Sequence, residues 1–213
     1  PMDYDGDGDN DLVVATADKP SKGAYFFENP GGDNKFPVFK PGVREGKAVH
    51  NMTVSYVGGE RIVQTPGRYY PDFKDTCLED PEPIRYRPEF YAGRAKQWKR
   101  ADYDGDGLVD LIFGISDWRD YGWDDAFNEQ GEWVQGPLHG YVYVALNEGT
   151  AEKPQYAEAF RIQAGGKPLD VYGCPSPNLA DWDDDGDLDL ICGEFLDKFT
   201  YLENIGSRTE PEY

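Results

Sequence analysis

The chain has 213 residues, with 41 Asp and Glu against 21 Lys and Arg, and a formal net charge of −20. That charge argues against nucleic acid and anionic membrane surfaces as partners, because both would repel the protein. Aromatic residues make up 15% of the chain, which argues against disorder. No apolar run approaches the ~20 residues of a membrane-spanning helix, so we expect no membrane insertion. The 25 Gly and 16 Pro favour short strands and many turns.

Three acidic segments share the template D-x-D-x-D-G-x-x-D-L, from Asp3 to Leu12, Asp102 to Leu111 and Asp181 to Leu190. In a tightly turning loop, Asp at positions 1, 3 and 5 point inward, and Gly at position 6 permits the turn. A carbonyl at position 7 and the Asp at position 9 would complete a shell of oxygen ligands. Ca²⁺ takes six to eight such oxygens, whereas clustered carboxylates without a cation repel one another. The repeat predicts up to three structural Ca²⁺ ions rather than a merely solvated acidic turn.

An EF-hand is the nearest alternative metal loop. It needs a bidentate Glu at position 12 and flanking helices. Position 12 here is Val14, Phe113 or Cys192, and each loop leads into a short apolar run with strand character. The sequence therefore places the loops between strands and excludes the EF-hand.

An aromatic segment ending in Asn and then Gly follows each acidic loop, at Tyr25–Gly31, Tyr141–Gly149 and Phe199–Gly206. A further short strand pattern comes after each of the first two. Four antiparallel strands per repeat are typical of a β-propeller blade, which buries its faces against neighbouring blades. We therefore predict an all-β fold, a β-propeller present as an incomplete set of three to four blades.

The acidic loops, each followed by an aromatic strand that ends in Asn and then Gly, resemble the FG-GAP/VCBS repeats that also build the propellers of integrin α-subunits. The resemblance implies Ca²⁺ in the loop between the first two strands of a blade, in a module of an exported protein. It implies side-chain ligands Asp3, Asp5, Asp7 and Asp11; Asp102, Asp104, Asp106 and Asp110; and Asp181, Asp183, Asp185 and Asp189. The position-7 carbonyls would come from Asp9, Leu108 and Asp187.

The repeats divide the chain into a single, partial propeller domain: repeat 1 at about 1–46, an irregular blade or insertion at about 47–94, repeat 2 at about 95–165 and repeat 3 at about 166–213. The loop spacing exceeds the usual spacing of the family, which leaves the blade number open. Both ends interrupt a repeat, so we expect a fragment of a larger propeller, or an open array that other blades or domains complete. Within the irregular stretch, Met52–Thr65 predicts a hairpin around Gly58-Gly59.

The second repeat carries an insertion, Ser116–Gly140, between its acidic loop and its aromatic strand. Binding residues concentrate on such loops, and aromatic faces suit sugars, so a carbohydrate or protein ligand is a candidate partner. The alternative is that these aromatic side chains pack the insertion onto the scaffold. Both irregular stretches are expected on the face opposite the calcium loops. The candidate ligand face comprises Trp118, Tyr121, Trp123, Trp133 and His139.

Two functions remain open. The favoured one is a non-catalytic, calcium-stabilised module for binding or adhesion, in a secreted, periplasmic or cell-surface protein, because weak calcium sites suit calcium-rich compartments. The alternative is a polysaccharide lyase or glycoside hydrolase that uses His139. No zinc, triad or phosphate-loop pattern accompanies either histidine, so the sequence assigns no catalytic residue. The three cysteines allow at most one disulfide.

Overall fold

The computed structural model describes residues 1–31, 35–90, 96–122, 125–196 and 198–213. Over these residues the protein is built from antiparallel β-strands and one short helix, α1 (Phe73–Thr76). The predicted all-β class is therefore confirmed. The chain forms two compact units, and each is described by itself: Pro1–Met52 with Ile62–Arg85, and Thr53–Arg61 with Tyr86–Tyr213.

The first unit contains a three-stranded antiparallel sheet that follows the first acidic loop. Its strands are β1 (Leu12–Thr16), β2 (Gly23–Phe27) and β3 (Val43–Gly46), in that order. Tyr4 of the acidic loop packs between the rings of Phe26 and Phe73, at centroid distances of 5.0 and 5.9 Å. The loop is thus anchored by an aromatic side chain at its second position.

The irregular stretch forms strands in simple succession. β4 (Thr53–Val57) is joined to β5 (Glu60–Thr65) by Gly58 and Gly59, both with positive φ, which confirms the predicted hairpin. β6 (Arg68–Tyr70) and β7 (Glu82–Pro83) extend the same sheet. Glycine suits this turn because it adopts positive φ without steric cost.

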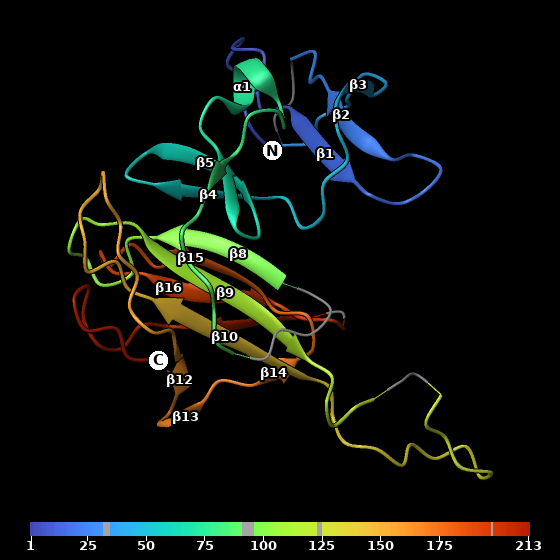
Figure 1. Ribbon diagram of the computed structural model, residues 1–213, viewed down its shortest axis with the longest axis vertical. Coiled ribbons are helices and arrows are strands. Elements are labelled where there is room, and N and C mark those ends of the chain that lie inside the picture. Colours follow the sequence, from blue (N-terminus) through green and yellow to red (C-terminus); the bar gives the residue numbers. More distant parts are fainter. Residues whose placement is uncertain (32–34, 91–95, 123–124, 197) are drawn as a thin grey trace. The chain divides into compact units, whose positions relative to one another are not determined.

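The second unit contains a five-stranded sheet and a three-stranded sheet, both of which can be followed in Figure 1. One has the order β11-β10-β9-β8, with β14 also paired to β10; the other has the order β15-β16-β17. β12 (Gln163–Ala164) and β13 (Lys167–Pro168) form a separate hairpin. The bounds of the sheet strands are β8 (Lys96–Ala101), β9 (Asp110–Asp117), β10 (His139–Ala145), β11 (Phe160–Arg161), β14 (Val171–Tyr172), β15 (Ser176–Ala180), β16 (Asp189–Gly193) and β17 (Phe199–Leu202).

These two sheets enclose the main hydrophobic core. Ile112, Val142 and Val144 of the first sheet are in one buried cluster with Leu190 and Cys192 of the second. Alternation along β10 explains this: Val142 and Val144 are buried in the core, whereas Tyr141 and Tyr143, which alternate with them, are only half-buried. All eight residues of β9 are buried, as expected for a central strand covered on both faces.

The architecture is repeat-like, because β1, β9 and β16 each begin directly after or at the end of an acidic loop and each pairs with the aromatic strand that follows it. In the part of the chain that the structure describes, none of the sheets closes on itself. No helix of the described residues is long and apolar enough to cross a membrane.

Candidate metal centre

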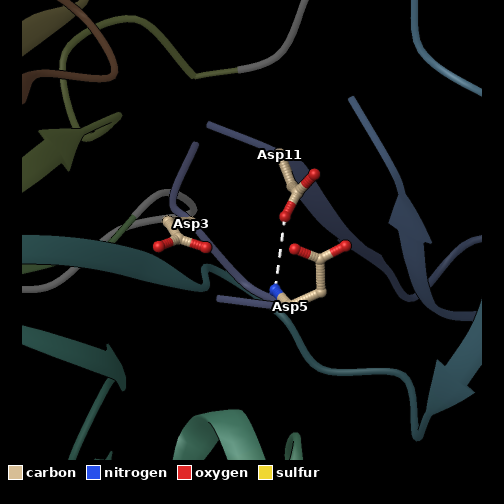
Figure 2. A group of neighbouring side chains, drawn as sticks. All are labelled: Asp3, Asp5 and Asp11. Atoms are coloured by element: carbon tan, nitrogen blue, oxygen red, sulfur yellow. Dashed lines mark hydrogen bonds between the residues drawn. The ribbon is translucent and has the colours of Figure 1, made fainter. Parts of the chain in front are cut away.

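Each acidic loop brings three carboxylates together. In the three groups one oxygen from every member lies within 4.8 Å of the others: Asp3, Asp5 and Asp11; Asp102, Asp104 and Asp110; Asp181, Asp183 and Asp185. Figure 2 shows the first group at the start of β1, where the Asp5 N–H donates to Asp11 Oδ2. These acidic clusters could hold a metal ion, as the sequence predicts.

The backbone of every loop is folded by the same internal hydrogen bonds. The N–H at position 7 donates to the Asp side chain at position 5, over 2.9, 2.7 and 3.1 Å for Asp9, Leu108 and Asp187. The N–H at position 5 donates likewise to the Asp side chain at position 3. Asp side chains commonly stabilise turns in this way. The alternating Asp residues therefore stabilise the turn by hydrogen bonds, in addition to giving it a negative charge.

Two positions of the loop adopt left-handed backbone conformations. Position 6 is the predicted glycine in all three loops, with φ of +98°, +86° and +99° at Gly8, Gly107 and Gly186. Position 4 is also left-handed, at Gly6, Gly105 and Asp184, with φ of +86°, +72° and +63°. Sequence reasoning missed position 4, although Gly and Asp are residue types that tolerate this conformation.

The Asp at position 9 has a second role, which the sequence did not predict. Asp110 is 1% exposed; its Oδ2 accepts from the Tyr103 N–H and its Oδ1 from the Asn147 N–H, both at 2.7 Å. Asp11 accepts equivalently from the N–H groups of Tyr4 and Asn29, and Asp189 from those of Trp182 and Asn204. A carboxylate oxygen has two lone pairs, so the two Asp110 oxygens, with one such donor each, keep acceptor capacity for a cation. Asp11 Oδ2 already accepts from both Tyr4 and Asp5.

The partner asparagine continues this network in each repeat. Asn147 Oδ1 accepts from the N–H groups of Gly149 and Gln155, both at 3.0 Å, and Asn204 Oδ1 accepts from Gly206 and Glu212 at 3.0 and 2.9 Å. Asn29 Oδ1 accepts from Gly31 at 3.2 Å. The Asn of the predicted turn thus holds the turn through its side chain, and its backbone N–H donates to the Asp at position 9.

The electrostatics of the loops favour the entry of a cation. Burial, with the charges of Asp104 and Asp106, raises the pKa of Asp110 to about 6 despite the lowering effect of its two backbone donors. Desolvation and neighbouring carboxylates also raise the pKa of Asp5, Asp183 and Asp187. A nearby positive charge would reverse these shifts, because it stabilises the ionised form.

Two buried carboxylate oxygens test independently whether the acidic loops fit a bound cation. Asp102 Oδ1 and Asp187 Oδ1 are buried, and no described group donates a hydrogen bond to either. An unsatisfied buried acceptor costs free energy. Asp102 belongs to the second cluster, so a cation held there by Asp102, Asp104 and Asp110 could satisfy its free oxygen. The donor set fits a hard cation.

A residue of the third repeat also contacts the second loop. Arg208 donates from Nη1 to the Tyr103 carbonyl at 3.1 Å and from Nη2 to the Asp102 carbonyl at 2.5 Å. Its Nη2 also lies 3.1 Å from Asp102 Oδ2. No sequence pattern singles out this arginine, because the contact depends on how the two sheets pack.

The remaining predicted ligands are less fully assembled. Asp7 and Asp106 at position 5, and Asp189 at position 9, are not members of the carboxylate groups. The position-7 carbonyls of Asp9, Leu108 and Asp187 remain predictions as ligands.

The aromatic side chains of the insertion between β9 and β10 contact one another. Tyr121 stacks on Trp133 at 4.4 Å and meets Trp118 edge-on at 5.3 Å. The indole N–H groups of Trp118 and Trp133 donate to Ser116 Oγ and the Gly136 carbonyl. These contacts favour the packing interpretation of the insertion. Trp123 of the candidate ligand face lies outside the described residues.

His139 lies at the start of β10 between two carboxylates. Its Nδ1 is 2.5 Å from Asp170 Oδ2 and its Nε2 is 3.2 Å from Asp120 Oδ2. The ring stacks on Tyr141 at 5.7 Å, and Arg161 covers the Tyr141 ring at 3.7 Å. Because both imidazole nitrogens contact carboxylates, the arrangement ties the insertion to the sheet.

Comparison with protein-family models found no match, and comparisons with curated proteins and with solved structures found none either. The functional argument therefore depends on the geometry of this chain.

Proposed function

We propose that the chain is a calcium-stabilised β-repeat module of the FG-GAP/VCBS type, which serves binding or adhesion in an exported protein. One observation carries the proposal: three loops of one template each gather three carboxylate oxygens within 4.8 Å of one another. An accidental acidic turn would not be expected to recur three times with a carboxylate group in every copy, formed by positions 1, 3 and 9 in the first two loops and by positions 1, 3 and 5 in the third. The finer fold assignment, a β-propeller present as an incomplete set of three to four blades, belongs to the same proposal.

Calcium is the cation that the donors favour. All the clustered side chains are carboxylates, the ligands of hard cations, and the clusters contain neither His nor Cys, which zinc and copper prefer. Turning loops of this kind provide flexible coordination, which Ca²⁺ accepts more readily than Mg²⁺. The residues that would hold each ion are the Asp at positions 1, 3, 5 and 9, with the carbonyl at position 7.

The role of the ion is structural. Bound Ca²⁺ would neutralise clustered carboxylates and reverse the pKa shifts of Asp5 and Asp110. It would also fix the turn whose position-9 Asp is hydrogen-bonded to the aromatic strand. Because the unfolded chain has no preformed site, binding free energy adds to the free energy of unfolding.

The test is thermal unfolding with calcium or with a chelator. A ligand at a hundred times its dissociation constant stabilises by about 2.7 kcal/mol per site, which raises Tm by roughly 5–10 °C in a chain of this size. We expect Asp104→Asn to reduce this calcium-dependent shift and the exposed control Asp18→Asn to preserve it. An identical melting curve in calcium and in chelator would refute the proposal.

The binding role and the export of the protein are supported only by the resemblance and by the exposed position of the insertion. Phe127 and Val134 remain 57% and 62% exposed in its described part. A lyase or hydrolase stays the second candidate, since His139, Tyr141 and Arg161 lie together. Incubation with a panel of acidic glycans distinguishes the two: a binding module retains glycans without cleaving them, and an enzyme releases products that His139→Ala abolishes.

A further inference from the structure

The two sheets of the second unit correspond residue by residue when they are aligned on position 9 of their acidic loops. Asp110 begins β9 and Asp189 begins β16. Counting from these residues, Ile112 corresponds to Ile191 and Gly114 to Gly193. The faces that carry these residues can therefore be compared directly.

In the β8–β11 sheet this face is the one that packs on the next repeat. Ile112 belongs to the core that also contains Leu190 and Cys192 of β16. At Gly114 the chain of the next repeat approaches so closely that an added Cβ would lie 2.1 Å from the Pro175 carbonyl oxygen. The contact between these sheets thus involves the residues two and four places after the position-9 Asp, and the second of these is a glycine.

The corresponding face of the β15–β17 sheet is uncovered. Phe199 and Tyr201, the cross-strand partners of Gly193 and Ile191, are 79% and 43% exposed. A Cβ added at Gly193 would meet its nearest atoms in Phe199 and Ser176 of the same sheet, at 3.6 and 3.7 Å. The glycine is present, but no other segment in the described part of the second unit fills the position.

The complementary type of face is exposed on the first repeat. Towards β9 the third repeat presents Leu190 and Cys192, the residues one and three after position 9. Their counterparts on β1 are Leu12 and Val14; Leu12 is half-buried and Val14 is 37% exposed. The second repeat cannot offer this face, because its counterparts Leu111 and Phe113 are both fully buried.

We propose that a second copy of this chain docks here, with its Leu12–Val14 face on the Ile191–Phe199 face of the first copy. The contact continues the repeat-on-repeat packing that already joins β9 to β16, and it does not depend on bound calcium. Because the two surfaces differ, association is head to tail and builds rings or filaments rather than a closed symmetric pair.

Sedimentation velocity over a wide range of protein concentration tests the proposal. We expect concentration-dependent association that Phe199→Asp weakens at least tenfold, since it places a charge in an apolar contact. Phe199 is exposed enough for this variant to fold, which circular dichroism verifies. Val134→Asp, at another exposed apolar residue, is the matched control and should associate like the parent. A monomer at every concentration, or equal association of Phe199→Asp and parent, would overturn the proposal.

Cysteine cross-linking tests the orientation. Chains carrying Val14→Cys are mixed with chains carrying Phe199→Cys under mild oxidation, and head-to-tail docking predicts a disulfide-linked pair of unlike chains. Dimers of like chains in place of this pair would overturn the proposed faces. A chain with both substitutions that closes on itself as a cross-linked monomer would overturn the assignment to a second copy.

Discussion

Replacement of Asn147 by alanine tests whether the strand-end asparagine is the structural anchor of the repeat. Asn147 is 3% exposed, and its side-chain oxygen accepts from the backbone N–H groups of Gly149 and Gln155. Alanine removes this acceptor. The bond from the Asn147 backbone N–H to Asp110 is unaffected, because it does not involve the side chain.

The expected loss follows from the two orphaned donors. Each buried N–H that loses its acceptor costs about 1–3 kcal/mol. Gln155 is exposed, so water can satisfy its N–H, whereas Gly149 is half-buried. One orphaned donor therefore remains, and we expect Asn147→Ala to lower the free energy of unfolding by about 1–3 kcal/mol. Asn204→Ala should cost less, because its two donors belong to the exposed Gly206 and Glu212, whose N–H groups water can satisfy.

Urea unfolding followed by tryptophan fluorescence is the appropriate assay. All five tryptophans of the chain belong to the second unit, which also contains both asparagines. The fluorescence transition therefore reports the unit that carries the substitutions. Measurements in calcium and in chelator separate the anchor from the metal.

Asn178→Ala provides the control, because Asn178 is exposed and makes one side-chain bond, to the Ser176 carbonyl at 3.3 Å. Exposed substitutions of this kind usually change stability by less than about 0.5 kcal/mol. If Asn147→Ala unfolds at the same urea concentration as Asn178→Ala, the anchor contributes nothing and the reasoning fails.

Two further predictions concern the packing on the two faces of β9. Gly114→Ala should destabilise the second unit by about 1–3 kcal/mol in the same urea assay, because its Cβ would meet the Pro175 carbonyl oxygen at 2.1 Å; Gly193→Ala, with no atom nearer than 3.6 Å, should not destabilise the monomer. Phe113→Ala should cost about 3–5 kcal/mol, since Phe113 is fully buried and its ring lies 4.8 Å from that of Trp98. A Phe113→Ala loss below 1 kcal/mol, roughly that of a surface substitution, would contradict this view of the core.

The acidic loops could be predicted because their information is local. Asp at alternate positions and Gly at position 6 determine the turn within ten residues, and the structure gathers three of the predicted carboxylates in each loop. The double role of Asp110 could not be read from the sequence, because one of its donors, the Asn147 N–H, is 37 residues away. Arg208 was missed for the same reason, as it contacts a loop 106 residues before it.

The strands were likewise predictable from alternation and turn residues, whereas the assembly of sheets was not. The Gly58-Gly59 pair between two alternating segments predicts the β4–β5 hairpin, and both glycines adopt positive φ in the structure. The aromatic side chains of the insertion were open to two interpretations, because a stacked ring and a ligand-facing ring have the same residue type. The contact of Tyr121 with Trp133 favours packing, and this depends on the loop conformation rather than on its composition.

The position-9 aspartate explains why fold and metal binding should be inseparable in this protein. Its carboxylate accepts one N–H group from its own loop and one from the end of the aromatic strand. The same burial that makes this anchor strong also raises the pKa of Asp110. A cation at the loop would stabilise the ionised carboxylate, and thus the form that can accept both bonds. Loss of such a cation would therefore weaken the strand-end turn as well as the loop.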